Sequence, residues 1–360
     1  MSDLEYTPHE PDHELGAPPF HFLSGERSGV DEPEPSIEKA EQETSGAPSI
    51  PHLSAEWVGD DKPQPTFAPH EPDSEAPAEL FQSWWQPEIV PPARIPHLGH
   101  LALLAGFLMI GFVCMTASVF IAVHFHLDGV MSLDGIKTNV HFILGSEAIL
   151  YLVTLGLSIP IFPLLWQKSF FAGIHWRGAT ARLLRWRLIA VAVGCIVLAI
   201  IDDQLLPGPK NAPIDEMFRT PGAAWMMFGF GISFAPFFEE IAFRGFLLPA
   251  LATAWDWLAE KRTGAAARPI DDNGHPQWSI AAMVTASIAT SLPFALMHAE
   301  QTGWSPGPFV LLISVSLILC AVRLKTRSLA ASTLVHACYN FILFSTALIS
   351  SGGFRHLDKM

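Results

Sequence analysis

Three short polar clusters interrupt the apolar second half of this 360-residue chain. The first contains Glu239, Glu240 and Arg244, the second Phe294 and His298, and the third His336 and Asn340. Each lies in a stretch apolar enough to cross a bilayer, where an ionisable side chain costs about 2.5 kcal/mol or more unless it finds a partner in a bundle interior or wet cavity. Groups on separate helices can satisfy one another only by converging. The sequence therefore predicts an active site where the three clusters meet.

The first cluster offers a paired and an unpaired carboxylate. Glu240 and Arg244 are four residues apart, a spacing that brings side chains together on one helix face, so we expect the guanidinium to neutralise this carboxylate. Glu239 points about 100° away and can face another helix. A carboxylate beside an imidazole is a candidate general base for activating water. We expect His298 to be its partner or a metal ligand.

The third cluster offers hydrogen-bond donors. His336 and Asn340 are again four apart, and their N–H groups could stabilise an oxyanion. A neutral His336 could instead coordinate a metal. Taken singly, an intramembrane Glu–Arg pair can simply stabilise the bundle, and His298 or Asn340 can form interhelical hydrogen bonds. The coincidence of all three clusters favours catalysis.

Other polar residues in the apolar region belong to no such constellation. For these residues we expect packing or interfacial roles. They are Glu147, Asp202, Asp203, His124, His126 and His141.

The composition changes abruptly near Arg94. Residues 1–93 carry 20 acidic and 3 basic side chains and hold 16 of the 30 prolines, whereas the rest of the chain has a net charge of +3. A segment so acidic and so poor in aliphatic residues cannot bury enough apolar surface to order itself. The sequence predicts a disordered tail over 1–93, N-terminal transmembrane helices over 94–220 and a catalytic core over 221–350. The acidic charge of the tail argues against a nucleic-acid partner.

Seven apolar runs are long enough for a bilayer of about 30 Å. They cover about 99–125, 140–165, 188–206, 221–258, 279–299, 308–323 and 329–350. The fourth is too long for one simple crossing, and Pro236 and Pro249 are expected to bend it or to mark its exit from the bilayer. The sequence thus predicts an all-α polytopic membrane protein.

Basic residues predict the orientation of these spans. The connections after the second, fourth and sixth spans carry 11 lysines and arginines, against 5 on the opposite side. The positive-inside bias places the first side, and with it the acidic tail, in the cytoplasm. We expect the protein to reside in the cell membrane.

Helix rise predicts one difficulty for the site. If the fifth span begins near residue 279, His298 lies about 28 Å from that face, whereas His336 lies only about 10 Å from it. A tilt, a bend at Pro293 or a helix that starts outside the bilayer would be needed to bring the two imidazoles level.

The three clusters resemble the motifs of the CAAX-protease and bacteriocin-processing family of intramembrane proteases, which reads EExxxR, FxxxH and HxxxN on successive helices. Glu239, Glu240 and Arg244 match the first motif, Phe294 and His298 the second, and His336 and Asn340 the third. The resemblance covers about residues 221–345. The earlier spans and the tail carry no family motif.

The resemblance implies an all-helical membrane endopeptidase. In such an enzyme the first glutamate and the histidine of the second motif, here Glu239 and His298, would activate water. The last pair, His336 and Asn340, would support the oxyanion. The motifs leave open whether glutamate and histidine act alone or Glu239, His298 and His336 hold a divalent metal such as zinc. A membrane-associated or prenylated peptide is the implied substrate, and the lipid bilayer is the expected surrounding partner.

Two other functions compete with proteolysis. A non-catalytic scaffold or immunity protein of the same fold is the main alternative, although intact motifs count against it. Intramembrane Glu, His and Arg also form proton relays in transporters, but transport predicts inverted repeats, and the sequence has no such internal symmetry.

Overall fold

The computed structural model describes residues 94–129, 132–137, 139–206, 208, 221–271 and 274–355. Over these residues the regular structure is helical, with one isolated extended bridge between Ile270 and Pro276. The helices are α2 (Leu98–His124), η1 (Leu127–Gly129), α3 (Leu133–Lys137), α4 (Val140–Trp166), α5 (Phe170–Gly173), α6 (Gly178–Leu183), α7 (Arg185–Leu205), α9 (Pro221–Ile232), α10 (Phe234–Glu240), η2 (Ile241–Leu247), α11 (Leu248–Thr263), α12 (Ile280–His298), α13 (Pro306–Thr326) and α14 (Leu329–Ser350). The all-α prediction is confirmed, while the predicted disorder of residues 1–93 falls outside the described residues.

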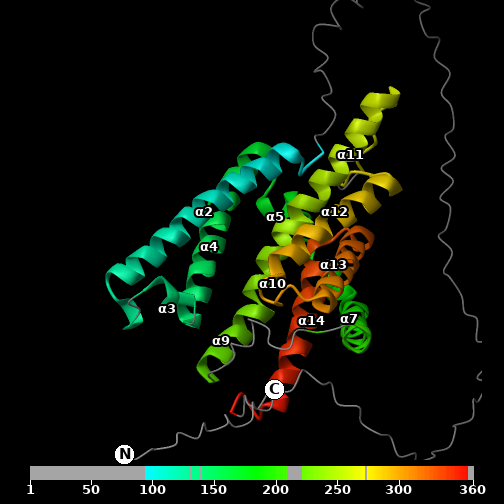
Figure 1. Cartoon of the computed structure of the whole chain (residues 1–360). Helices are drawn as coiled ribbons and strands as arrows, with labels where there is room; N and C mark the ends of the chain where they lie inside the picture. Colours follow the sequence, from blue (N-terminus) through cyan, green and yellow to red (C-terminus); the bar gives the residue numbers. More distant parts are fainter. Residues whose placement is uncertain are drawn as a thin grey trace, which may run out of the picture. The chain divides into compact units, whose positions relative to one another are not determined.

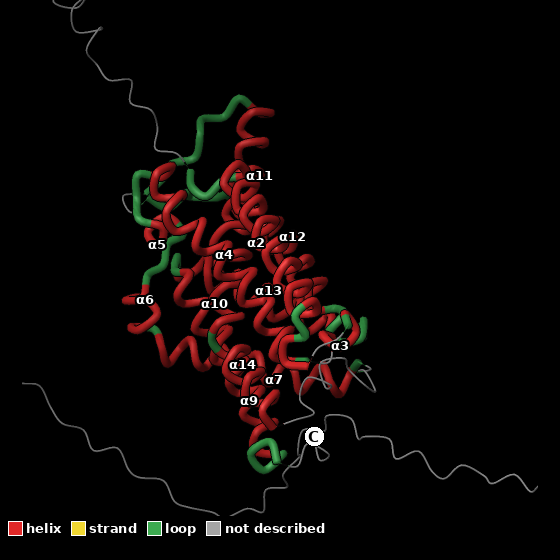
Figure 2. Tube along the Cα trace, turned by 90° about the vertical axis from the view of Figure 1, so that its left-hand side faces the viewer, coloured by secondary structure: helices red, strands yellow, loops and turns green. Residues whose placement is uncertain are grey.

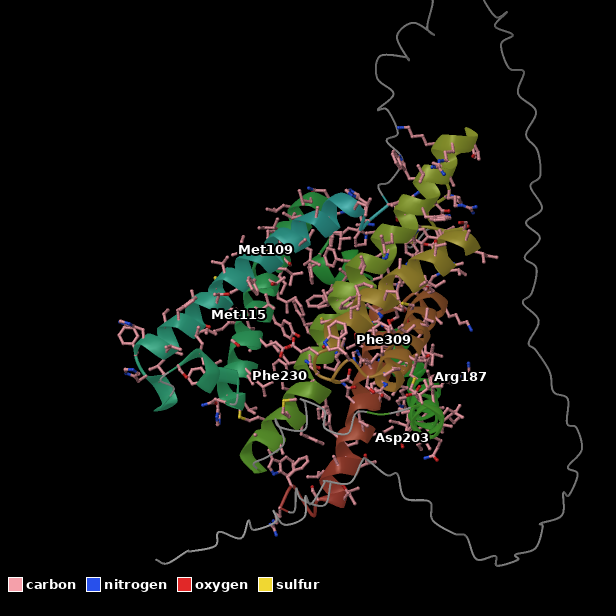
Figure 3. The ribbon with its side chains drawn as sticks, in the orientation of Figure 1. Met109, Met115, Arg187, Asp203, Phe230 and Phe309 are labelled. Atoms are coloured by element: carbon pink, nitrogen blue, oxygen red, sulfur yellow. The ribbon has the colours of Figure 1, made fainter. Side chains whose placement is uncertain are left out.

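Seven helical stretches of the described chain are long and apolar enough to cross a membrane. They are Leu98–His124, Val140–Trp166, Arg185–Leu205, Gly222–Thr263, Ile280–His298, Pro306–Thr326 and Leu329–Ser350. Large apolar side chains are left exposed on their outer faces, as for Met109 on α2, which is 61% exposed (Figure 3). Such faces suit contact with lipid tails rather than water. The seven predicted spans are therefore confirmed, and the chain is an integral membrane protein.

The first two spans form a closely packed pair. Helices α2 and α4 lie side by side in Figure 1 and share an extensive contact. Gly111 makes this possible, because a Cβ there would lie 2.8 Å from the backbone oxygen of Leu150 on α4. Small residues let helix backbones approach closely in a bilayer, where packing drives association.

The fourth span is interrupted in the middle. Helix α9 ends at Ile232, and α10 begins at Phe234 after a break at Ser233. Pro236 explains the break, because its ring clashes with the carbonyl of the residue four positions earlier, Ile232. Pro249 sits in the first turn of α11, a position that tolerates proline. The predicted bend is thus found at Pro236.

A π-helical segment, η2, follows α10 directly and carries Arg244. Aromatic rings fix it against the earlier helices: Phe246 of η2 lies 4.8 Å from Phe162 and 5.7 Å from Trp166 between ring centroids. One turn before it, Phe238 stacks on Tyr151 of α4 at 3.9 Å. These contacts hold the acidic segment of the fourth span on the α2–α4 pair.

Several connections meet at one end of the spans, in a group that we call the loop junction: His175, His275, Arg323 and the start of α14. The rings of His175 and His275 stack with centroids 3.9 Å apart, and Arg323 Nη2 lies 3.3 Å from His175 Nδ1. The backbone of Leu329 donates to the carbonyl of His175 at 3.0 Å. Figure 2 shows the loops beside α5 that contribute to this group. The junction therefore ties the α5–α6 connection, the α11–α12 connection and the end of α13 to the helix that carries His336.

Acid should weaken the fold through the loop junction. Burial lowers the pKa of His175 to about 2 and that of His275 to about 4, and in each case the nearby guanidinium groups of Arg323 and Arg177 lower it further. Asp271 opposes the shift at His275, and Arg327 adds to it. Below pH 6.5 the unfolded chain binds protons that the folded chain refuses, so stability falls as pH drops from 6.5 towards 4.

The expected loss at pH 5 is about 2 kcal/mol for His275 alone. Thermal unfolding of the wild type and His275→Gln at pH 7.5 and pH 5 checks this, with His124→Gln on the exposed end of α2 as a control. The variant should lose less stability on acidification than the wild type and the control do. Equal losses in all three proteins would show that His275 is not held neutral.

Candidate active site

The polar clusters converge around Glu239 and Glu240, the last two residues of α10. Both carboxylates are buried, as is Arg244 in η2. A π-turn widens the helix locally, and such turns occur often at functional sites. Here it follows the two glutamates and sets the direction in which Arg244 leaves the helix.

Arg244 is the counter-ion of Glu240. Its Nη1 lies 2.9 Å from Glu240 Oε1, with both side chains fully buried. The other terminal nitrogen, Nη2, donates to the Oγ and the backbone oxygen of Ser316 on α13, at 2.7 and 3.2 Å. The guanidinium also lies over the ring of Phe294, 4.5 Å from its centroid. The predicted Glu240–Arg244 pair is present, and it links the fourth span to α12 and α13.

Glu239 lies between two imidazoles from different helices. Its Oε1 is 3.9 Å from Nε2 of His298, at the end of α12, and its Oε2 is 3.8 Å from Nε2 of His336 on α14. These separations are too long for direct hydrogen bonds. The His298 side chain is 21% exposed, whereas those of Glu239 and His336 are 9% and 6% exposed. Access to the carboxylate is therefore from the His298 side.

Hydrogen bonds at Nδ1 set the tautomer of each histidine. His298 Nδ1 lies 2.9 Å from the carbonyl oxygen of Phe294, and His336 Nδ1 lies 3.2 Å from Glu240 Oε1. Both partners are acceptors, so each Nδ1 carries the proton. In the neutral rings the lone pair is then on Nε2, the nitrogen that faces Glu239. The Nε2 atoms of two histidines therefore face the same carboxylate.

Phe294 forms the apolar wall of this group. It is fully buried, and its centroid lies 4.9 Å from the ring of His298, 5.9 Å from that of His336 and 5.3 Å from that of Phe243. A ring in this position keeps both imidazoles in place and lowers the local dielectric, which strengthens electrostatic interactions.

The predicted difference in depth does not separate the histidines. Helix α12 packs on α11 and α13, and its last residue, His298, reaches the same carboxylate as His336 in the third turn of α14. Helix α12 therefore brings a histidine at its end, and α14 a histidine in its third turn, to the same carboxylate. Motif order predicts the convergence better than helix rise does.

Asn340 has a structural partner. Its Nδ2 donates to the carbonyl of Gly231 at 2.7 Å, beside the break between α9 and α10. Carbonyls at helix ends lack their intrahelical donors, so this bond stabilises the interruption. One N–H of the amide is therefore committed, and the second remains the candidate donor for an oxyanion.

Glu147, for which the sequence predicts a packing or interfacial role, lies near the candidate site. It accepts a hydrogen bond of 2.5 Å from Tyr151, whose ring stacks on Phe238, and it lies close enough to His298 to interact electrostatically. Its charge also acts on Glu239. The sequence does contain a signal for Glu147. An ionisable residue inside a membrane span is a functional candidate by default.

The donors around Glu239 are the ones that the sequence suggested for a metal. Among the described residues no group of three histidine, cysteine, aspartate or glutamate side chains is arranged to hold a metal ion. The Glu239 oxygens lie 3.9 and 3.8 Å from Nε2 of His298 and His336. The assignment of a metal to Glu239, His298 and His336 stays a prediction, and no step below uses a metal.

The fold and the site define a class: a polytopic helical membrane protein whose buried carboxylates and imidazoles meet inside the bilayer-spanning region. Residues 221–342 match the family model of the Rce1-like proteins, described as type II CAAX prenyl endopeptidase Rce1-like. The matched segment contains the three motifs up to Asn340, so the resemblance to CAAX-type intramembrane proteases is confirmed. No curated protein and no solved structure matches the chain.

Proposed function

We propose that the chain is an intramembrane endopeptidase that hydrolyses a peptide bond near the end of a membrane-associated peptide. The observation that carries this proposal is the position of Glu239 between the Nε2 atoms of His298 and His336, at 3.9 and 3.8 Å. A carboxylate and an imidazole that share a water molecule can activate it by general-base catalysis. The family match supports a protease of the CAAX-processing type.

In the proposed reaction Glu239 accepts a proton from a water molecule held beside His298. The hydroxide adds to the carbonyl carbon of the scissile bond and produces a tetrahedral oxyanion. The second N–H of Asn340 stabilises this charge, and His336 does so as an imidazolium, with its Nδ1 proton held by Glu240 and a second proton on Nε2. The proton on Glu239 then passes to the leaving nitrogen, and the C–N bond breaks.

Glu240 and Arg244 have a supporting role. Their fully buried pair, at 2.9 Å, provides a fixed dipole beside the reaction, and Glu240 orients His336 through Nδ1. Preorganised charges of this kind act without reorganising during the reaction. The membrane region supplies a dry surrounding for these interactions.

The substrate is proposed to enter from the bilayer. A lipid-modified or otherwise membrane-bound peptide would present its chain at the accessible side of His298. The excess of basic residues on one side supports an orientation with the acidic tail in the cytoplasm. The cell membrane is the proposed location.

Replacing His298 tests the proposal against the scaffold alternative. In His298→Ala the water loses one of its two bases, so we expect cleavage of a membrane peptide library to fall about 10²-fold or more. The measurement uses purified full-length protein in nanodiscs, with His124→Ala on the end of α2 as a control that should keep wild-type activity.

The same assay with a chelator tests whether cleavage depends on a metal. With water activated by Glu239 and His298 alone, cleavage persists in EDTA, whereas activity lost in EDTA and restored by zinc would assign a metal to Glu239, His298 and His336. A His298→Ala variant as active as the wild type would contradict the assigned chemistry. An inactive wild type would favour the non-catalytic scaffold.

A further inference from the structure

The loop junction contains buried nitrogen atoms that lack partners. Arg323 is 2% exposed and its Nε has no hydrogen-bond partner, and His275 is 3% exposed with Nε2 likewise unpartnered. A buried donor left unsatisfied costs about 1–3 kcal/mol, more when the group is charged. Such groups in a folded protein call for an explanation, and an unseen ion is one of the standard ones.

The charges around these atoms are unbalanced. Arg323 has no carboxylate of the described residues within ion-pair distance, and its Nη2 lies instead 3.3 Å from the neutral partner His175. Asp271 pairs with Arg327 through its Oδ2 and accepts the backbone N–H of His275 with Oδ1 at 2.9 Å. Arg323 is thus a buried cation without a paired anion among the described side chains.

Two further cations lie at the edge of the junction. Gly274 has a φ of +78°, and a Cβ there would come within 2.9 Å of Lys168 Nζ, so the ammonium group lies against this turn. Arg177 is partly exposed, and its charge acts on both His175 and His275. The low pKa of His275, about 4, has burial as its main cause and the charges of Arg177 and Arg323 as the next.

We propose that the loop junction binds the phosphate of an anionic phospholipid headgroup. The exposed Lys168 and the partly exposed Arg177 would meet the phosphate at the surface, and the N–H groups of Arg323 and His275 would donate to its oxygens from behind. Arginine and phosphate form strong charge-assisted hydrogen bonds. An anion there balances the buried guanidinium and satisfies its Nε.

The position favours a lipid as the source of this phosphate. The junction collects the C-terminal ends of α4 and α13 and the N-terminal ends of α12 and α14, all of which span the membrane. Basic pockets between the ends of transmembrane helices lie at the depth of phospholipid headgroups. Beside them, the exposed Phe171 offers an apolar surface for the acyl chains.

The site is also connected to the catalytic helix. Ser328 Oγ donates to the carbonyl of Arg177 at 3.0 Å, and Leu329 donates to that of His175 at 3.0 Å. Ser328 is the N-cap of α14 and Leu329 is its first residue, and this helix carries His336. A bound headgroup would therefore stabilise the start of this helix.

Lipid-dependent thermal stability of the full-length protein tests the proposal. We compare nanodiscs of phosphatidylcholine alone with nanodiscs that contain about 30% phosphatidylglycerol, a level at which the surface is clearly anionic. The anionic lipid should raise the unfolding temperature of the wild type by about 4 °C, as expected for a ligand bound by the folded state. Native mass spectrometry should retain one phosphatidylglycerol per protein.

The variants Lys168→Gln and Arg177→Gln should lose both the shift and the retained lipid. Arg187→Gln removes an equal charge from the exposed start of α7, where Figure 3 labels it, and should keep both. Equal shifts in all variants, or a loss in Arg187→Gln as well, would overturn the site. So would an equal shift in phosphatidylcholine nanodiscs with inorganic phosphate, which would identify a free anion as the ligand.

Discussion

Replacing Glu239 with glutamine is expected to abolish most peptidase activity while leaving the fold intact. The amide keeps the size of the side chain but cannot accept a proton from water, and removal of a general base costs about 10²- to 10⁴-fold in rate. The contacts of Glu239 at 3.8 and 3.9 Å are not hydrogen bonds, so stability should change by about 1 kcal/mol or less.

Turnover number and unfolding temperature, measured on the same purified samples, check both parts of this expectation. Asp203→Asn provides the matched control, because it makes the same acid-to-amide change on α7, outside the site. An active Glu239→Gln enzyme would assign the base to another residue. Inactivity with a large loss of stability would point to a structural role instead.

Removing Arg244 is expected to give the largest loss of stability. In Arg244→Ala the carboxylate of Glu240 stays fully buried without its counter-ion, and the bonds to Ser316 disappear. Breaking a buried pair in this way costs about 3–5 kcal/mol, whereas an exposed charge contributes about 0–1 kcal/mol. Arg187→Ala, at an exposed arginine, should therefore leave the unfolding temperature nearly unchanged.

A double variant separates the pair from the packing. Arg244→Met with Glu240→Gln removes both charges and keeps most of the volume, so it should recover much of the lost stability. If the double variant is no more stable than Arg244→Ala, then the lost bonds to Ser316 and the lost contact of the guanidinium with the Phe294 ring account for the effect, and the pair itself contributes little.

The spacing of the motifs predicted the central residues of the candidate site. Four-residue spacing on a helix placed Arg244 on Glu240, and the cost of stranded charges in a bilayer predicted that Glu239, His298 and His336 converge. These are local periodicity and burial arguments, which need no knowledge of the tertiary fold. The spans were predictable for the same reason.

Features that depend on tertiary contacts were not predictable. The bond from Asn340 to Gly231 exists because the chain breaks at Ser233, and the sequence marked that break only through Pro236. The π-turn of η2 has no sequence signature. Glu147 lies near the candidate site because α4 packs near α10 through Tyr151 and Phe238, a contact that no motif records.

Mass-spectrometric analysis of cleavage products tests the central claim most directly. Purified full-length protein in nanodiscs is incubated with matched C-terminal peptides that differ only in carrying or lacking a prenyl group. The account predicts that the wild type cuts one internal peptide bond of the membrane-bound peptide and releases a short C-terminal fragment, and that Glu239→Gln releases none. Absence of any fragment with the wild type, or equal release by the two proteins, would contradict it.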